Sequence, residues 1–311
     1  MKAIVLNQYG TPENLQLQEV ETPTPNADQV LIKVYAAAVN FLDIGKAMGA
    51  FKDQFQLSFP WIPGIDFSGV VAATGDQVKD FKVGDEVYGL NLDGGSFAEY
   101  VAVSTELISY KPHSLNFIEA ASVPVSAETA WQALFQHDQI LKGKTVLIHG
   151  GAGAVGSYAV QLASQAGATV IVTADLADVP YLKLLGADQI IDKNEAFEKL
   201  VNNVDLVLDL VGKDVQQRSY QIIKEGGYLV AANQPPSVEE AARYKIKALF
   251  FQLKPSGAGL SVISGLLDTG KLKIGLAAVY PLEEVVIAWN GMLGKLPNMK
   301  KNGRIVLEVT K

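Results

Sequence analysis

The chain has 311 residues, of which 49% are hydrophobic and 19% charged, with a formal net charge of −7 and no cysteine. This length and composition are typical of a globular protein with two domains and exclude a disordered chain. The lack of cysteine excludes disulfides, thiolate catalysis and cysteine–zinc sites, and the three histidines have no metal-binding spacing, so we expect no metal. With no basic cluster and no apolar run of membrane-spanning length, we expect a cytoplasmic protein without a nucleic-acid or membrane partner.

Residues 1–120 contain short runs rich in β-branched and aromatic residues, separated by glycine and proline turns. The predicted strands are Lys2–Leu6, Leu15–Val20, Gln29–Ala36, Asp66–Thr74, Glu86–Gly89 and Phe97–Ala102. A series of this kind predicts a closed or nearly closed β-barrel.

From about residue 119 onward, helices and strands alternate. Helices are predicted over 127–134, 155–166, 178–185, 195–200 and 214–224, and strands over 145–149, 168–174, 188–191, 204–209 and 227–232. This alternation predicts a doubly wound parallel sheet with helices on both faces. A helix over 259–268 and strands near 276–280 and 304–309 follow, and we expect the β-rich end to return to the first domain. The predicted domains are 1–122 with 270–311, and an inserted domain over 123–269.

A glycine-rich turn lies between a β-branched run, Val146–Ile148, and a helix that covers Tyr158. In the pattern G-x-G-x-x-G the first glycine allows a tight turn, the second lets a pyrophosphate approach the backbone, and the third packs the helix against the strand. The alternative is a glycine turn without a ligand, but strand, turn and helix follow in the order that a dinucleotide site requires. The predicted site comprises Gly151, Ala152, Gly153, Ala154, Val155 and Gly156.

Three further motifs accompany the glycine loop: Pro63-Gly-Ile-Asp-Phe-Ser-Gly69, Val83-Gly-Asp-Glu-Val-Tyr-Gly89 and Gly95-Ser-Phe-Ala-Glu-Tyr100. With these motifs the chain resembles the medium-chain dehydrogenase/reductase superfamily, and in particular its zinc-free branch of quinone and enone reductases. The resemblance implies a GroES-like β-barrel catalytic domain, a Rossmann-type cofactor domain and a homodimer. Zinc-containing members carry cysteine and Gly-His-Glu where this chain has Asn40 and Gly64-Ile65-Asp66. The resemblance to the zinc-free branch therefore implies zinc-independent hydride transfer from NAD(P)H to a quinone or an α,β-unsaturated carbonyl.

By this resemblance, Asn40 and Asp43 line the cleft below the nicotinamide, and the Asn40 amide donates to the developing enolate oxygen. The alternative is that Asn40 caps a turn while Asp43 starts a helix and pairs with Lys46. Lys46 is either a proton donor or a solvated helix residue. None of these residues is a convincing general acid, so solvent is the alternative proton source.

Other residues are assigned to the cofactor. Thr129, Phe250 and Phe251 match family residues near the nicotinamide. The simpler interpretation is that Thr129 is an ordinary helix hydroxyl and that the two phenylalanines belong to the core. Asn233 and Gln234 follow a predicted strand at the carboxyl edge of the sheet, where ligands bind.

The preference between NADPH and NADH is contested. Asp175 follows the second predicted strand of the cofactor domain, and an acid there binds the ribose hydroxyls and repels a 2′-phosphate. Lys193 replaces a family tyrosine near the 2′-phosphate, and Arg304 is a second basic candidate. The family's habit favours NADPH, with NADH as the alternative because of Asp175. A second class of function is an NAD(P)H-binding protein with little turnover, which acts as a redox sensor or structural partner.

Overall fold

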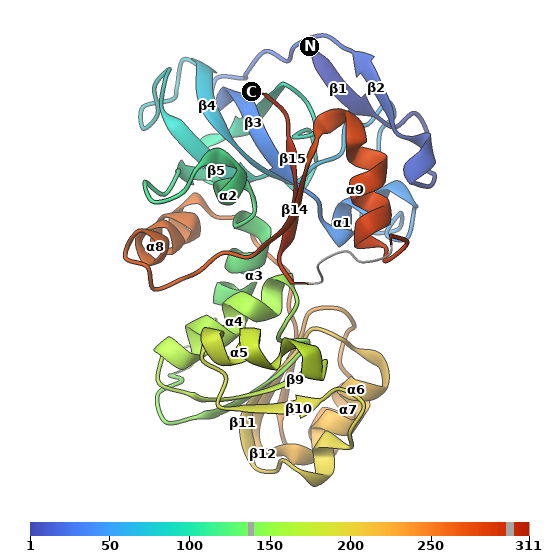
Figure 1. Ribbon diagram of the computed structural model, residues 1–311, viewed down its shortest axis with the longest axis vertical. Coiled ribbons are helices and arrows are strands. Elements are labelled where there is room, and N and C mark those ends of the chain that lie inside the picture. The colour runs from blue at the N-terminus through green and yellow to red at the C-terminus, as the bar shows by residue number, and fades with distance from the viewer. Residues whose placement is uncertain (136–139, 297–301, 311) are drawn as a thin grey trace. The chain divides into compact units, whose positions relative to one another are not determined.

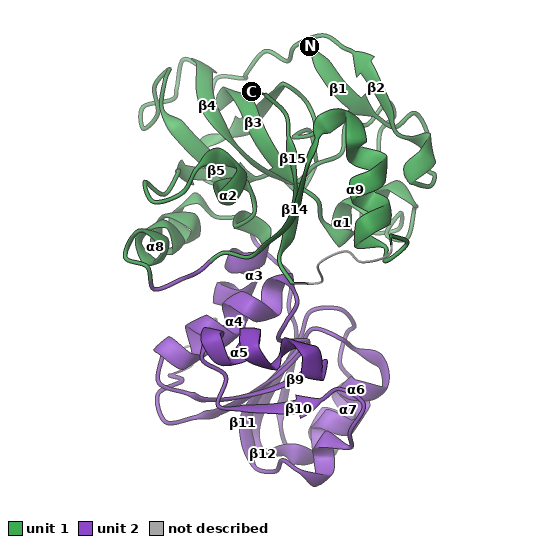
Figure 2. Ribbon diagram, viewed as in Figure 1, with its two compact units in different colours: residues 1–125, 255–270, 274–311 green, residues 126–254, 271–273 purple. Residues whose placement is uncertain are grey.

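The computed structural model describes residues 1–135, 140–296 and 302–310 (Figure 1). The chain forms two compact units, coloured separately in Figure 2. Unit 1 comprises residues 1–125, 255–270 and 274–311, and unit 2 comprises residues 126–254 and 271–273. In the described part of the chain, no helix is both long and apolar enough to cross a membrane.

The second unit ends earlier than the sequence predicts, because α8 (Gly257–Asp268) belongs to unit 1 and not to the inserted domain. The hydroxyl of Tyr88 donates to the Leu260 carbonyl at 2.7 Å, and the Ser114 amide donates to the Asp268 carboxylate at 2.9 Å. These bonds join α8 to segments of unit 1 that lie more than 150 positions earlier in the sequence.

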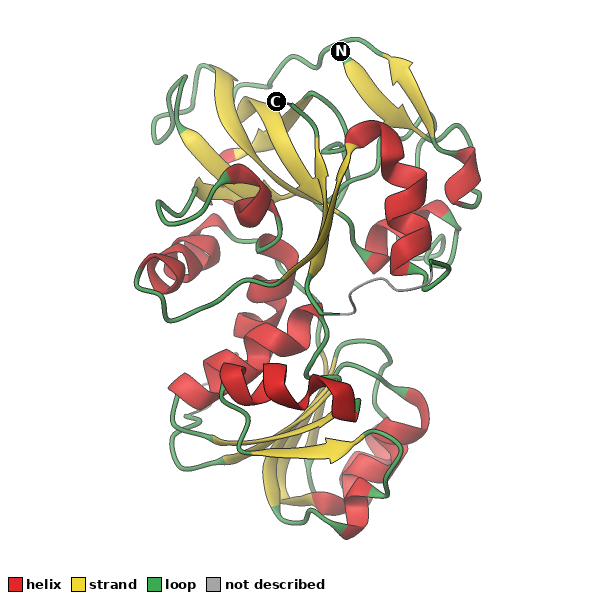
Figure 3. Ribbon diagram, in the orientation of Figure 1, coloured by secondary structure: helices red, strands yellow, loops and turns green. Residues whose placement is uncertain are grey.

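Unit 1 contains a two-stranded antiparallel sheet and a seven-stranded sheet, drawn in yellow with the other strands in Figure 3. The strands of unit 1 are β1 (Lys2–Val5), β2 (Gln16–Glu19), β3 (Gln29–Ala38), β4 (Asp66–Thr74), β5 (Glu86–Leu90), β6 (Tyr100–Ser104), β7 (Ile108–Tyr110), β14 (Leu276–Pro281) and β15 (Arg304–Glu308). The larger sheet runs β14-β15-β3-β4-β5-β7, and β6 pairs with β3. This arrangement confirms the predicted GroES-like β-domain and places the late strand β15 beside β3.

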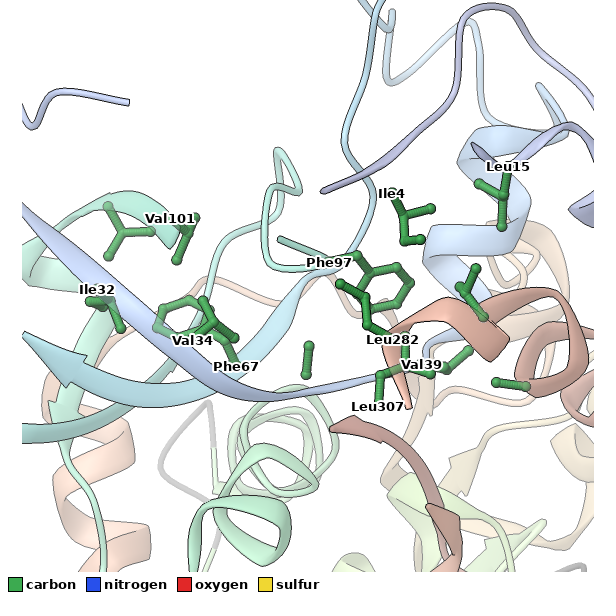
Figure 4. Close-up of a cluster of buried hydrophobic side chains, with 14 of the residues drawn as sticks. Ile4, Leu15, Ile32, Val34, Val39, Phe67, Phe97, Val101, Leu282 and Leu307 are labelled. Carbon is green, nitrogen blue, oxygen red and sulfur yellow. The ribbon is translucent and has the colours of Figure 1, made fainter. Parts of the chain in front are cut away.

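The core of unit 1 joins side chains of this sheet to those of β1 and of two helices. Alternate residues of β3 are buried, as expected for a strand with one face against a core. Figure 4 shows Val34, Phe67 and Leu307, from three different strands, in one apolar cluster. The rings of Phe97 and Trp289 pack edge to face, with their centroids 6.3 Å apart. The helices of this unit are α1 (Phe41–Ala47), α2 (Phe117–Ala121), α8 and α9 (Val285–Met292), and α3 (Pro124–Phe135) runs across the boundary between the units.

Unit 2 is a parallel six-stranded sheet in the order β10-β9-β8-β11-β12-β13. Its strands are β8 (Thr145–His149), β9 (Thr169–Ala174), β10 (Gln189–Asp192), β11 (Val204–Asp209), β12 (Ile223–Ala231) and β13 (Lys247–Phe250). Counted from β8, this is the order 3-2-1-4-5-6 of a dinucleotide-binding fold. The predicted Rossmann-type sheet is confirmed. Its strand order reverses at β8, so a ligand site is expected at the carboxyl ends of β8 and its neighbours.

The helices of unit 2 are α4 (Ala154–Gln165), α5 (Val179–Leu185), α6 (Lys213–Ser219) and α7 (Val238–Arg243). Two predicted helices are shorter than expected. The one over 195–200 is a single 3₁₀ turn, Phe197–Lys199. The one over 214–224 gives way to a 3₁₀ turn and then to β12, because Ile223 already pairs with Val204 in the sheet.

Candidate functional site

The glycine-rich turn of unit 2 joins β8 to α4. The Gly153 amide donates to the Gly150 carbonyl at 3.1 Å, and the Gly153 carbonyl accepts from the Ser157 amide at 2.9 Å, so Gly153 is the N-cap of α4. The first N–H groups of α4, including those of Ala154 and Val155, have no acceptor within the helix. Together with the helix dipole they form a site for an anion.

Each glycine of the turn has its own steric reason. A Cβ on Gly151 would lie 2.3 Å from Cγ1 of Val172, and one on Gly156 would lie 2.2 Å from the Gly150 carbonyl oxygen. These two glycines are required for packing. A Cβ on Gly153 would meet only the Gly150 oxygen, at 3.3 Å, and would otherwise point into open space. The backbone at Gly153 is therefore open to approach, and the turn fits a dinucleotide pyrophosphate.

Asp175 and Lys193 follow the neighbouring strands β9 and β10, and they form an ion pair. The Lys193 ammonium lies 2.8 Å from Oδ1 and 2.9 Å from Oδ2 of Asp175. Its pKa is raised, chiefly by this hydrogen bond and also by the carboxylates of Asp175, Asp178 and Asp192. The lysine side chain is half exposed, at 53%. The two residues that the sequence set in competition for the cofactor ribose are thus bound to each other.

The loops after β11 and β12 meet at the same edge of the sheet. The side-chain amide of Asn233 donates to the Leu210 carbonyl. The Lys213 amide donates to Oε1 of Gln234 at 3.0 Å. Asn233 and Gln234 therefore lie at the predicted edge, where they hold the loop that follows β11.

The other residues assigned to the cofactor in unit 2 differ in exposure. Thr129 is buried on α3. Phe250 ends β13 with 39% of its surface exposed, whereas Phe251 is buried and its amide donates to the Ala231 carbonyl at 2.8 Å. Of the two aromatic residues, Phe250 is the more accessible to a ligand.

Unit 1 holds a buried polar cluster around the guanidinium of Arg304. Its Nη2 lies 2.7 Å from Oδ1 of Asn40 and 2.7 Å from Oδ2 of Asp66. The side-chain amide nitrogen of Asn40, Nδ2, donates to Oδ2 of Asp66 at 3.2 Å and to the Ala38 carbonyl at 3.3 Å. Both hydrogens of this amide therefore have acceptors inside the unit.

Asp43 lies in the same cluster, on the first turn of α1. Its carboxylate accepts from the amides of Asn40 at 3.0 Å and Gly64 at 3.2 Å. Burial and the nearby charge of Asp66 raise the pKa of Asp43 to about 7. Burial also raises the pKa of Asp66 to about 6, although the Arg304 charge opposes this shift. Asp43 takes the helix-start position that the sequence suggested as an alternative.

Lys46 is buried and is not the solvated helix residue that the sequence allowed. Its ammonium donates to the Leu92 carbonyl and lies 4.2 Å from the centre of the Phe55 ring. Burial lowers its pKa. The predicted trio Asn40, Asp43 and Lys46 thus comes from one helix and its N-cap, and each member has partners within unit 1.

Arg304 was expected near a 2′-phosphate, but its guanidinium is buried at the start of β15 and bound to Asp66 and Asn40. The sequence assigned no role to Asp66, which begins β4, or to Asp209, which is buried at the end of β11. The signal available for both was an acid at one end of a largely apolar strand. Among the residues that the structure describes, no three histidine, aspartate or glutamate side chains are grouped to hold a metal.

Comparison with family models gives two matches. The alcohol dehydrogenase GroES-like domain matches residues 26–113, and the zinc-binding dehydrogenase model matches residues 185–307. The first covers most of the strands of unit 1, and the second spans the later part of unit 2 and the return to unit 1.

Similar proteins agree with these matches. A 2-methylene-furan-3-one reductase of Solanum lycopersicum is 39% identical over 288 residues, which cover 88% of this chain and 70% of that protein. A quinone oxidoreductase of Mus musculus is 30% identical over 95% of this chain and 97% of its own length. The solved quinone oxidoreductase of Coxiella burnetii superposes with a TM-score of 0.89 and 35% identity, over 100% of this chain and 99% of the other.

Proposed function

The chain belongs to the medium-chain dehydrogenase/reductase superfamily, and from its turn geometry and its relatives we propose that it reduces the C=C bond of an α,β-unsaturated carbonyl with NADPH. That it is a nicotinamide-dependent oxidoreductase follows from the relatives as a group. The finer choice of an enone is supported by relatives named 2-methylene-furan-3-one reductase and alkenal/one oxidoreductase, which are 39% and 37% identical.

The observation that carries the cofactor part of this proposal is the accessible backbone at Gly153, in a turn whose other two glycines are fixed by packing. When bound, the nicotinamide supplies a hydride to the β-carbon of the enone, whose carbonyl oxygen takes the electron pair before a proton reaches the α-carbon. The protein holds the pyrophosphate with the first N–H groups of α4 and the helix dipole. Lys193 and Asp175 then discriminate between NADPH and NADH at the adenosine ribose.

We propose NADPH as the preferred donor because Lys193 supplies an accessible ammonium for a 2′-phosphate, and because one relative is named an NADPH-dependent oxidoreductase. The Asp175 carboxylate reduces this preference, since the phosphate must share the lysine with it. NADH is therefore accepted as well.

Asn40, Asp43 and Lys46 are the candidate catalytic residues of unit 1. The Asn40 amide can donate to an enolate oxygen only by releasing Ala38 or Asp66. Its contacts therefore favour a positioning role within unit 1. We propose water as the proton source and, because the chain has no cysteine, a reaction that does not depend on zinc.

We also propose a cytoplasmic homodimer formed through the outer edge of β13, the last strand in the sheet of unit 2. An edge strand offers unpaired backbone groups to a second copy. Ala248→Pro would interrupt that edge, and light scattering should then report a monomer; a dimer that survives this change uses another surface.

The proposed activity is tested by following nicotinamide oxidation with 3-buten-2-one or a benzoquinone, each with NADPH and with NADH. We expect the largest kcat/KM for the enone with NADPH. A larger kcat/KM for the quinone would make the quinone the substrate class. Cofactor binding without turnover in all four combinations would favour the binding-protein alternative.

A further inference from the structure

The carboxylate of Asp209, the last residue of β11, holds the turn that follows it. Oδ1 accepts from the amides of Val211 at 2.9 Å and Gly212 at 2.8 Å, and Oδ2 accepts from the side-chain amide of Gln216 at 3.2 Å. Both Asp209 and Gln216 are buried. Three N–H donors therefore converge on one buried carboxylate at the carboxyl edge of the sheet.

The same turn is held from its other side by the loop after β12. The side-chain amide of Gln216 also donates to the Gln234 carbonyl at 2.9 Å, and Oε1 of Gln234 accepts from the Lys213 amide at 3.0 Å. Gly212 and Lys213 have φ values of +78° and +55°. A lysine in this left-handed region costs conformational energy and persists only where surrounding contacts hold it. The network thus keeps a strained turn in one conformation.

This turn lies beside the predicted pyrophosphate site. A Cβ on Gly150 would lie 3.3 Å from Cγ2 of Val211. In the sheet, β8 lies between β9 and β11. A dinucleotide with its pyrophosphate at α4 and its adenosine ribose at the end of β9 extends its other half toward the ends of β11 and β12.

We propose that Asp209 and Gln216 are positioning residues for the nicotinamide half of the cofactor. They fix residues 210–212 so that Val211, which is 46% exposed, and its backbone contact the nicotinamide ribose. Both act through the turn, because their own side chains are buried and bound to it. This inference rests on the proposed function, since it requires a bound nicotinamide dinucleotide.

The test compares two ligands that share adenosine and pyrophosphate, NADH and ADP, of which only NADH carries the nicotinamide ribose. In Gln216→Ala, calorimetric titration should show NADH binding weakened about tenfold and ADP binding changed less than about twofold. The matched control is Gln217→Ala, the exposed neighbour on the same helix, which should bind both ligands like the wild type.

Equal weakening of NADH and ADP in Gln216→Ala would indicate general loosening of unit 2 and overturn the inference, as would unchanged binding of both. If Gln216→Ala does not fold, Asp209→Asn gives the same comparison from a buried residue, because an amide nitrogen in place of Oδ2 cannot accept from Gln216, while Oδ1 still accepts from Val211 and Gly212. A wild-type protein that binds neither ligand would instead overturn the proposed function.

Discussion

The ammonium of Lys193 contacts both carboxylate oxygens of Asp175, at 2.8 and 2.9 Å. Asp175→Ser removes the competitor for this ammonium, so a 2′-phosphate gains a full partner. We expect the ratio of kcat/KM for NADPH to that for NADH to rise about tenfold, and to fall by a similar factor in Lys193→Ala. The exposed Lys199→Ala is the control and should leave the ratio unchanged. An unchanged ratio in both test variants would place the ribose elsewhere.

Substitutions at two glycines of the turn are expected to separate folding from binding. Gly153→Val adds a side chain whose Cβ has one close neighbour, the Gly150 carbonyl oxygen at 3.3 Å, so the protein should still fold, with a slightly lowered melting temperature, and lose cofactor binding. Gly156→Ala sets a Cβ against the Gly150 carbonyl, and such overpacking costs about 1–3 kcal/mol or more. Thermal unfolding and fluorescence titration with NADPH measure the two effects. Wild-type affinity in Gly153→Val would contradict the assignment of the turn.

The Arg304–Asp66 pair should matter more at neutral than at acid pH. Arg304→Leu leaves the buried Asp66 carboxylate without its cation, at an expected cost of about 3–5 kcal/mol in the free energy of unfolding at pH 7.5. Because burial has raised the pKa of Asp66 to about 6, this carboxyl is protonated at pH 5 and no longer requires the cation. Urea unfolding should therefore show a smaller deficit at pH 5.

A second change tests the same pair. Asp66→Asn removes the charge, so the double variant Arg304→Leu with Asp66→Asn should recover more than half of the stability lost in the single variant at pH 7.5. A deficit that is the same at both pH values and in the double variant would show that Arg304 stabilises the unit by packing alone.

His149 is expected to stay neutral well below its usual pKa. The Ser219 hydroxyl donates to the Val215 carbonyl at 2.7 Å, so its oxygen accepts from Nε2–H of His149, 3.0 Å away. Nδ1 then accepts from the Thr173 hydroxyl at 2.9 Å. Burial, followed by the charge of Arg218, lowers the pKa of the imidazole from 6.5 to about 3.

This lowered pKa predicts a loss of stability on the acid side. The unfolded chain binds a proton at His149 below about pH 6.5, whereas the folded chain does so only near pH 3. Its contribution is therefore complete above pH 6.5 and declines as the pH falls toward 3. Between pH 7 and pH 5 the wild type should lose about 2 kcal/mol more than His149→Gln in urea unfolding. Equal losses in the two proteins would mean that the imidazole is charged in the folded state.

Local patterns were sufficient to predict five of the six strands in the sheet of unit 2, and its glycine turn, because these depend on contiguous residues. The membership of α8 was not predictable in this way, since it depends on the bond from Tyr88 to Leu260, which are 172 positions apart. The strand β13 was missed because its four residues, Lys247–Phe250, include no β-branched residue, whereas the equally short β10 contains two isoleucines.

In the candidate site too, the sequence indicated which residue types are present, but only the fold determines which of them contact each other. The residue types at Asp175 and Lys193 indicated chemistry at the ribose, but their pairing depends on β9 and β10 being neighbours in the sheet. The contact of Arg304 with Asn40 joins positions 264 apart. Because the sequence does not show this contact, Arg304 was interpreted as a phosphate ligand, although its guanidinium neutralises the buried carboxylate of Asp66.

The place of β15 between β14 and β3 has a consequence for how the protein is made. On a ribosome, every residue of unit 2 has been translated before Arg304, which both completes the larger sheet of unit 1 and neutralises Asp66. Unit 2 is thus free to fold first. Until β15 is translated, the edge of β3 stays unpaired and the Asp66 carboxylate has no Arg304 to neutralise it. Nascent chains stalled at residue 290 should resist protease in unit 2 and be cut in unit 1, and protection of both would contradict this order.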